Sequence, residues 1–185
     1  PEMFNDNVPH SPAAKSDIIR IHLIKKYGGV WVDSSVFCNK PLDNWLPSGT
    51  FMFSNPGKDR MIASWFIKRD EEDCPLINKW YDKTVQYWKE HSLPHTYFWF
   101  HYLFNDVYNS DQQSREIWDR QIKIDVDSVG SKSAHLLVPY QKTTIERSDE
   151  IERRILSKLD PVYKLSNKFP IKKDSSFKFL YNTIK

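Results

Sequence analysis

The clearest pattern of hydrophobic and polar positions in the chain lies between residues 16 and 27. Its apolar side chains recur with helical spacing on a broad face, which predicts a mostly buried helix. Ser16 suits the helix N-cap with Asp17 in the first turn, and Gly28 and Gly29 end the pattern. The apolar positions are Ile18, Ile19, Ile21, Leu23, Ile24 and Tyr27.

Short apolar runs and helical spacings alternate along the rest of the chain. The run Val30-Trp31-Val32 follows the glycines and predicts a buried strand that ends at Asp33. Further strands are expected over residues 51–53 and 135–139, and helices over 59–69, 76–91, 97–108 and 145–159. Residues 1–15 and 37–48 are typical of loops, and residues 110–133 show no clear pattern. The mixture predicts an α/β or α+β protein.

The size of the chain suits one domain, because it has 185 residues. Only 39% of them are hydrophobic, but 7 Trp, 9 Tyr and 11 Phe can bury enough area for a core. The composition changes near the end, where residues 164–185 contain six lysines and one acidic residue. We therefore expect a main domain over 1–163 and a basic, aromatic segment over 164–185.

The C-terminal segment has two readings. A basic segment with interleaved aromatic residues can lie on an anionic membrane surface. The more frequent arrangement is a solvated lysine face over a packed aromatic side. The aromatic residues concerned are Phe169, Phe177, Phe179 and Tyr181.

Charge and cysteine content exclude several classes of protein. A net charge of +3 is too small for general affinity for nucleic acid, so no nucleic-acid partner is expected. No apolar run is long enough for a membrane-spanning helix, and none resembles a signal peptide. Cys38 and Cys74 are too few for a disulfide framework or a zinc site and are expected as reduced thiols in the cytoplasm, with a single disulfide left open. The chain begins at Pro1 rather than Met, which indicates a fragment.

The residues best suited to chemistry lie around the first predicted helix and strand. Asp17 and Arg20 are three apart, so a helix places them on one face, where they can offer a carboxylate and a guanidinium to a polyhydroxylated ligand. Asp33 follows a strand, at the end where open α/β sheets bind ligands. Each has an ordinary alternative: a surface ion pair for Asp17 and Arg20, and a turn residue for Asp33.

The spacing of these residues resembles that of a known family. Two short segments are similar to the core of sugar transferases with a GT-A fold. They are Ser16-Asp17-Ile-Ile-Arg20 and, further along, Gly28-Gly29-Val-Trp31-Val-Asp33. The resemblance is to the capsular polysaccharide synthesis proteins, close to glycosyltransferase family 32. Weaker similarity covers residues 34–42, 98–106 and 164–168. The resemblance implies a GT-A-like α/β fold that lacks its N-terminal part in this chain.

The resemblance also implies roles for individual residues. The residues that match Asp17 and Arg20 contact the donor sugar, and the one that matches Asp33 opens an Asp-x-Asp motif. That motif holds the nucleotide diphosphate through Mn²⁺ or Mg²⁺. Here Ser35 stands at the third position, so a carboxylate ligand is missing and weaker metal binding is expected, with Asp33 and Ser35 as ligands.

Other residues are weaker candidates for substrate binding. Gly28, Gly29 and Trp31 lie in the motif segment. His101 and Asp106 lie on the aromatic helix five residues apart, so they need not share a face. A buried structural histidine is the favoured interpretation of His101. Trp99 and Trp118 could stack on sugar rings or pack in the core, and His135 could ligate a metal or be structural.

Together these features predict a glycosyltransferase of capsular or surface polysaccharide synthesis. It would move a sugar from a nucleotide-sugar donor to a glycan or lipid-linked acceptor, with retention of configuration as the resemblance implies. A cytoplasmic location is expected, and peripheral membrane contact through residues 164–185 is the alternative to a solvated lysine face. The alternative is a degenerate, non-catalytic module that binds a glycan or a nucleotide.

Overall fold

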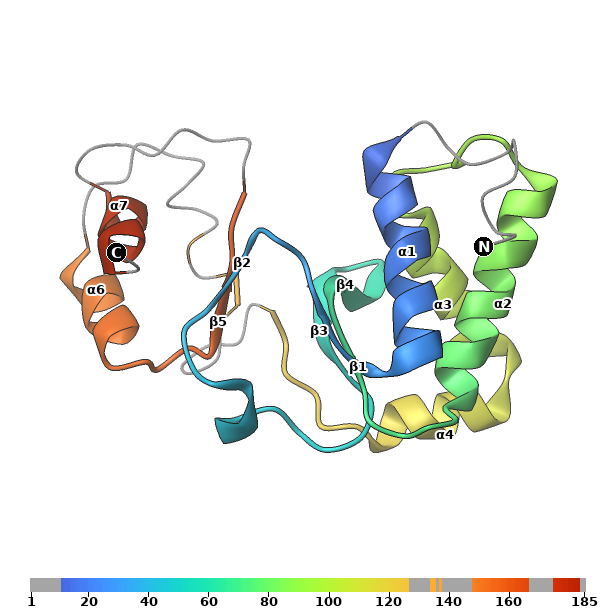
Figure 1. Cartoon of the computed structure of the whole chain (residues 1–185), viewed down its shortest axis with the longest axis horizontal. Helices are drawn as coiled ribbons and strands as arrows, with labels where there is room; N and C mark the ends of the chain where they lie inside the picture. Colours follow the sequence, from blue (N-terminus) through green and yellow to red (C-terminus); the bar gives the residue numbers. More distant parts are fainter. Residues whose placement is uncertain (1–10, 127–133, 136, 138–147, 167–174, 184–185) are drawn as a thin grey trace. The chain divides into compact units, whose positions relative to one another are not determined.

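The computed structural model describes residues 11–126, 134–135, 137, 148–166 and 175–183. The chain divides into two compact units. The first comprises Pro1–Val32 and Pro47–Lys123, and the second comprises Asp33–Leu46 and Ile124–Lys185. The mixed helices and strands agree with the predicted α/β class (Figure 1).

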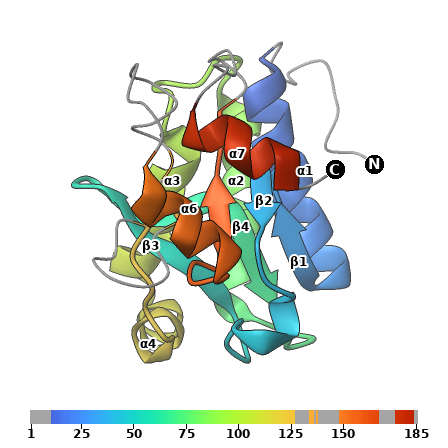
Figure 2. The ribbon, with the colours of Figure 1, turned by 90° about the vertical axis from the view of Figure 1, so that its left-hand side faces the viewer.

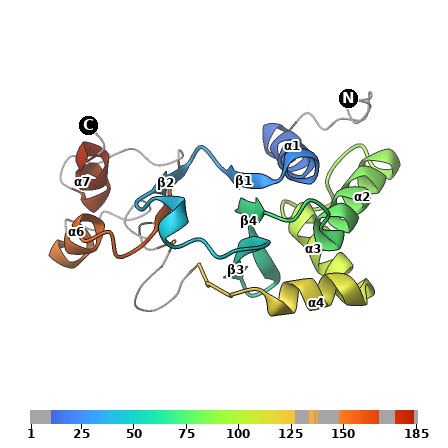
Figure 3. The ribbon, with the colours of Figure 1, turned by 60° about the horizontal axis from the view of Figure 1, so that its bottom comes forward.

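The first unit is built on an antiparallel sheet. Its strands are β1 (Gly29–Val32), β3 (Phe51–Gly57) and β4 (Arg60–Arg69), in the order β1-β4-β3 (Figure 3). In the centre of β4, Ile67 lies opposite Trp31 on one side and Met52 on the other. The strand predicted at 30–32 is therefore present but only half-buried, because β1 is paired by β4 on one edge alone among the described residues.

Four α-helices complete the part of the first unit that the structure describes. They are α1 (Pro12–Tyr27), α2 (Pro75–Glu90), α3 (Trp99–Ser110) and α4 (Gln112–Arg120). α1 and α3 pack against the sheet, and α2 lies beside both of them (Figure 1). Trp80 stacks on Phe100 with ring centroids 4.2 Å apart, and Phe104 meets Trp118 edge to face. Trp99 and Trp118 are both buried in this core, which agrees with the packing interpretation.

The first helix begins earlier than predicted. Ser11, rather than Ser16, is its N-cap residue, and Pro12 occupies the first turn. Proline is favoured there because its fixed φ suits a helix and its missing N–H has no intrahelical partner at that position. Asp17 consequently lies in the helix interior. The predicted end is confirmed: Gly28 has a φ of 65° and donates its N–H to the Ile24 carbonyl at 2.9 Å.

One other prediction in this unit is wrong, and a region left without a prediction contains a helix. Residues 59–69, expected as a helix, form the strand β4. β4 is the central strand and is buried from Ile62 to Arg69, so its side chains do not alternate between apolar and polar. The polar region from 110 contains the unpredicted helix α4, which is capped by the Asp111 carboxylate accepting from the Ser114 N–H at 2.8 Å.

Among its described residues, the second unit contains a pair of strands and two α-helices. β2 (Val36–Cys38) and β5 (Val162–Lys164) are antiparallel, with Val36 opposite Lys164. α6 (Asp149–Leu156) and α7 (Ser176–Thr183) lie in front of this pair in Figure 2 and share a core with it. That core consists of Leu137, Ile151, Ile155, Tyr163 and Leu180, with Phe37, Leu165 and Phe179 packed against it.

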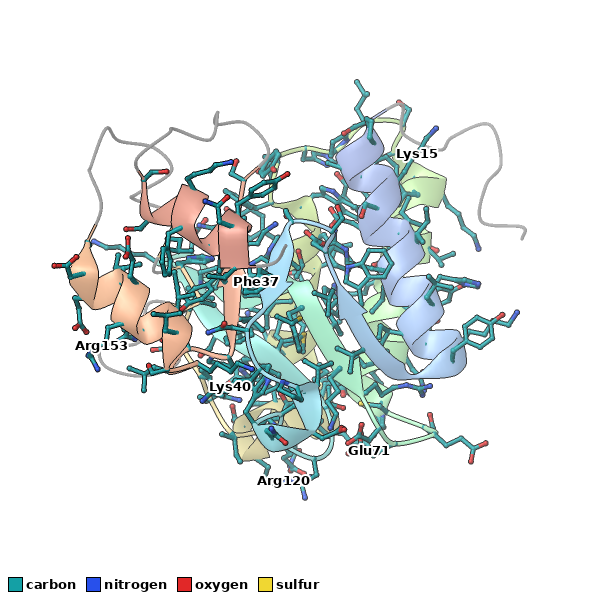
Figure 4. All side chains as sticks on the ribbon, turned by 60° about the vertical axis from the view of Figure 1, so that its left-hand side comes forward. Lys15, Phe37, Lys40, Glu71, Arg120 and Arg153 are labelled. Atoms are coloured by element: carbon teal, nitrogen blue, oxygen red, sulfur yellow. The ribbon has the colours of Figure 1, made fainter. Side chains whose placement is uncertain are left out.

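Sequence patterns located this unit less well. The predicted loop 37–48 contains β2 and the short 3-10 helix Leu42–Asn44. Residues 134, 135 and 137 are turns rather than the expected strand, and 136, 138 and 139 lie outside the described residues. The charged helix is confirmed as α6, whose exposed face carries Arg153 (Figure 4). Residues 145–147 lie outside the described part.

A buried ion pair ties β5 to α6. Arg154 Nη2 lies 2.6 Å from Asp160 Oδ1, and the Asp160 side chain is 0% exposed. Tyr163 donates its hydroxyl to Asp160 Oδ2 at 3.1 Å. Burial, followed by the Asp160 charge, raises the pKa of Tyr163 well above its ordinary value, so this hydroxyl stays a donor. The Asn39 amide adds donated hydrogen bonds to the Ile155 and Asp160 carbonyls. This network fixes the strand pair that carries Ser35 and Lys164 at its end.

Candidate functional site

The Asp17–Arg20 pair lies in the first unit, where α1 meets β4. Arg20 Nη1 is 3.1 Å from Asp17 Oδ1. The same nitrogen donates to the carbonyl and the hydroxyl of Ser64, each at 2.8 Å, and Nη2 donates to Ser16 Oγ at 3.0 Å. Its guanidinium carbon lies 5.5 Å from the centroid of the Trp31 ring. Arg20 is therefore held almost entirely by protein groups.

The side chains of Asp17 and Arg20 differ in their exposure to solvent. The Arg20 side chain is 7% exposed and that of Asp17 is 14% exposed. A ligand would reach the carboxylate more readily than the guanidinium, whose donors already bind Ser16 and Ser64. The arrangement suits a carboxylate that accepts hydrogen bonds from hydroxyl groups while a buried cation fixes its position. Trp31 is half-buried and packs against the core. Its contact with substrate stays a prediction.

His101 on α3 is close enough to Arg20 to be influenced by its charge. Burial, then Arg60, then Arg20 lower the pKa of His101 to about 3, with Asp59 acting weakly in the opposite direction. The imidazole is therefore neutral at physiological pH. Its Nδ1 is buried and has no hydrogen-bond partner within the described part of the chain. Asp106 is exposed and its carbonyl accepts from Ser110 Oγ at 2.6 Å, so the structure does not bring His101 and Asp106 together.

The turn between β3 and β4 is bound to α3 by contacts that the sequence did not reveal. Tyr102 donates its hydroxyl to Asp59 Oδ2 at 2.5 Å, and Arg60 lies 3.7 Å from the centroid of the Phe98 ring. The Tyr102 hydrogen bond is the main cause that lowers the pKa of Asp59. No local signal marks these residues, because Asp59 and Tyr102 are 43 positions apart in the chain.

A surface hollow of about 580 Å³ lies at the end of α1. Gly28 and Gly29 line it with Arg69, and charged residues of both signs complete its wall. A Cβ added at Gly28 would lie 3.0 Å from the Arg69 carbonyl, and φ there is positive, so both space and backbone favour glycine. The glycines are thus placed by chain geometry, and a contact with substrate stays a prediction.

The Asp33–Ser35 segment lies in the second unit and faces a lysine. Lys164 donates a hydrogen bond to Ser35 Oγ, and its Nζ is 3.6 Å from Asp33 Oδ2. Backbone hydrogen bonds hold this geometry: Leu165 N–H donates to the Ser35 carbonyl, and Lys164 N–H to the Ala134 carbonyl, both at 2.8 Å. Lys164 is 129 positions from Ser35, so the sequence pattern gave no sign of this contact.

This arrangement fits a divalent cation poorly. Mg²⁺ and Mn²⁺ prefer several oxygen ligands, whereas this segment offers one carboxylate and one hydroxyl. The Lys164 ammonium already contacts both groups and would repel a second cation. Within the described residues, no three His, Cys, Asp or Glu side chains form a group that could hold a metal. His135 is half-exposed, in a turn.

The sequence profile of a family described as capsular polysaccharide synthesis protein matches residues 4–184. No curated protein sequence and no solved structure matches the chain significantly. In the described residues, no helix is both long enough and apolar enough to cross a membrane.

Proposed function

The chain belongs to the family of capsular polysaccharide synthesis proteins, and on that premise we propose that it is a glycosyltransferase. The reaction would transfer a sugar from a nucleotide-sugar donor to a glycan or lipid-linked acceptor. The bond between the sugar and the diphosphate breaks, and a bond from the sugar to an acceptor hydroxyl forms. The acceptor's proton leaves with the nucleoside diphosphate or passes to solvent.

The Asp17–Arg20 arrangement is the observation that supports this proposal most strongly. A carboxylate that accepts hydrogen bonds from two sugar hydroxyls must hold one orientation while the glycosidic bond breaks. Arg20 supplies that fixation, because it binds Asp17 while Ser16 and Ser64 hold the guanidinium. Asp17 is then the donor-sugar contact and Arg20 a positioning residue.

Loss of the diphosphate requires positive charge near the leaving group, since negative charge develops there as the bond breaks. In the second unit, the Asp33, Ser35 and Lys164 cluster holds an ammonium that solvent can reach. We assign the diphosphate to this cluster by the resemblance of the motif segment.

The membrane contact of residues 164–185 remains a proposal. α7 packs through Leu180 and Phe179, which supports a structural role for that part.

Donor hydrolysis without acceptor tests this function. The protein is incubated with UDP-glucose, UDP-galactose, UDP-N-acetylglucosamine and GDP-mannose, and released nucleoside diphosphate is measured. Asp17→Asn removes the charge with little change in size and is expected to lower release by about tenfold or more. Asp82→Asn is the matched control, because the Asp82 side chain is 65% exposed on α2.

The rival function, a non-catalytic binding module, makes the opposite prediction. Such a module would bind a nucleotide sugar without releasing diphosphate from any of the four donors. Equal release by wild type and Asp17→Asn would refute the role of Asp17, provided both proteins give the same circular dichroism spectrum.

A further inference from the structure

Lys164 lies where the family resemblance places a divalent cation. Its ammonium donates to Ser35 Oγ and its Nζ is 3.6 Å from Asp33 Oδ2. The Lys164 side chain is 21% exposed and that of Asp33 is 23% exposed, so both can be reached from solvent. We propose that Lys164 is a built-in cation that binds the diphosphate of the donor, so that this step needs no divalent metal. The inference rests on the proposed glycosyltransferase function.

The charges of the cluster support the replacement of a divalent cation by the Lys164 ammonium. In an Asp-x-Asp motif, two carboxylates neutralise one divalent cation, and that cation presents its remaining coordination positions to the diphosphate. Here one carboxylate, Asp33, faces one ammonium, and Ser35 takes the place of the second carboxylate. The charges of the named groups cancel in both arrangements: one carboxylate with one ammonium here, and two carboxylates with one divalent cation in the motif. Ser35 and Lys164 are therefore compatible with each other. A carboxylate in place of Ser35 would add negative charge beside Lys164, and a divalent cation in addition to Lys164 would add positive charge.

The ammonium is also held in a defined place. Lys164 is the last residue of β5 and lies opposite Val36 in the strand pair. The buried Arg154–Asp160 pair braces the start of the same strand. An ammonium has three donors, and a lysine fixed by Ser35 and Asp33 keeps its charge directed without the entropy loss of a free surface lysine. Preorganised cations of this kind are suited to binding phosphate oxygens.

A simpler interpretation is that Lys164 and Asp33 form an ordinary ion pair. That interpretation predicts that nucleoside diphosphate binding is indifferent to Lys164. Calorimetric titration with UDP and with GDP separates the two interpretations. Each titration is made in EDTA, in Mg²⁺ and in Mn²⁺, for wild type, Lys164→Gln, Lys164→Arg and the control Lys158→Gln. Lys158 is an exposed lysine of the same unit.

The expected result has three parts. Wild type binds UDP or GDP in EDTA with an affinity within about twofold of that in Mg²⁺ or Mn²⁺. Lys164→Gln weakens binding by about ten- to a hundredfold, the range expected for loss of a charged hydrogen-bond donor. Lys164→Arg restores most of the affinity and Lys158→Gln leaves it unchanged. Circular dichroism spectra show that each variant is folded.

The contrary results are distinguishable. Loss of wild-type binding in EDTA overturns the inference whatever Lys164→Gln does, and leaves the glycosyltransferase proposal standing. Unchanged binding by Lys164→Gln also overturns the inference. Absence of binding to either nucleotide under every condition, by folded wild type, overturns both the inference and the proposed function.

Discussion

Replacement of Arg20 by methionine should destabilise the first unit strongly, because it removes the cation from a nearly closed site. Arg20 donates two hydrogen bonds to Ser64 and one to Ser16, and it neutralises Asp17. Methionine keeps much of the side-chain length and none of the donors. Removing one partner of a buried ion pair costs about 3–5 kcal/mol in general. Asp17 retains 14% exposure, so water compensates part of the loss, and we expect about 2–4 kcal/mol.

Urea unfolding followed by tryptophan fluorescence measures this loss. Six of the seven tryptophans lie in the first unit, so the signal reports mainly on the part that Arg20 stabilises. Arg20→Lys keeps the charge without the fork geometry and should lose an intermediate amount. Lys15→Gln is the matched control on the same helix, since Lys15 is exposed (Figure 4), and should change the free energy of unfolding by no more than about 0.5 kcal/mol.

The Asp17→Asn variant separates the loss of stability from the loss of activity. The asparagine oxygen can still accept from Arg20, so the expected stability loss is only about 1 kcal/mol. Donor turnover should nevertheless fall at least as far as in Arg20→Met. A loss below about 1 kcal/mol for Arg20→Met would show that its hydrogen bonds contribute little. Arg20 would then not be the residue that fixes the position of Asp17.

Three further predictions follow from other parts of the structure. The double variant Ser35→Asp/Lys164→Ala should bind UDP or GDP in Mn²⁺ and lose that binding in EDTA, whereas metal-independent binding by this variant would contradict the role given to Lys164. The lowered pKa of His101 means that the unfolded chain takes up a proton as the pH falls below about 6.5, while the folded chain stays neutral until about pH 3. Folded stability is therefore lost as the pH falls through that range, and His101→Gln should show a flatter dependence in urea titrations at pH 7, 6, 5 and 4; parallel curves would refute this. Asp160→Asn should cost about 3 kcal/mol by thermal unfolding because the Asp160 side chain is fully buried beside Arg154, against about 0.5 kcal/mol or less for the exposed control Glu150→Gln; equal losses would count against the buried network.

Sequence patterns predicted the elements whose apolar residues face one side. The helix ending at Gly28 and the helix over 76–91 are present, because each buries one face against its neighbours. The start of the first helix was placed five residues late, because Ser16 is a residue type common at N-caps but here its hydroxyl accepts a hydrogen bond from Arg20. β4 was mistaken for a helix because a central strand covered on both faces carries no period of two.

The candidate site was predictable only where its residues are close in the chain. Asp17 and Arg20 are one helical turn apart, and the structure joins them as an ion pair. Lys164 and Ser64 could not be found in this way. Lys164 contacts Ser35 across 129 residues of the chain, and Ser64 contacts Arg20 across 44 residues. Tertiary contacts of this kind depend on strand register and helix packing, which local patterns do not encode.

The most direct test of the central claim compares the affinity of a nucleotide sugar with that of its nucleoside diphosphate. If Asp17 contacts the donor sugar, Asp17→Asn should weaken binding of the preferred nucleotide sugar by about tenfold. The same substitution should leave the affinity for the diphosphate alone within about twofold of wild type. Isothermal titration calorimetry of wild type and Asp17→Asn with both ligands gives these four constants. Equal weakening of both ligands, or no weakening of either, would contradict the account.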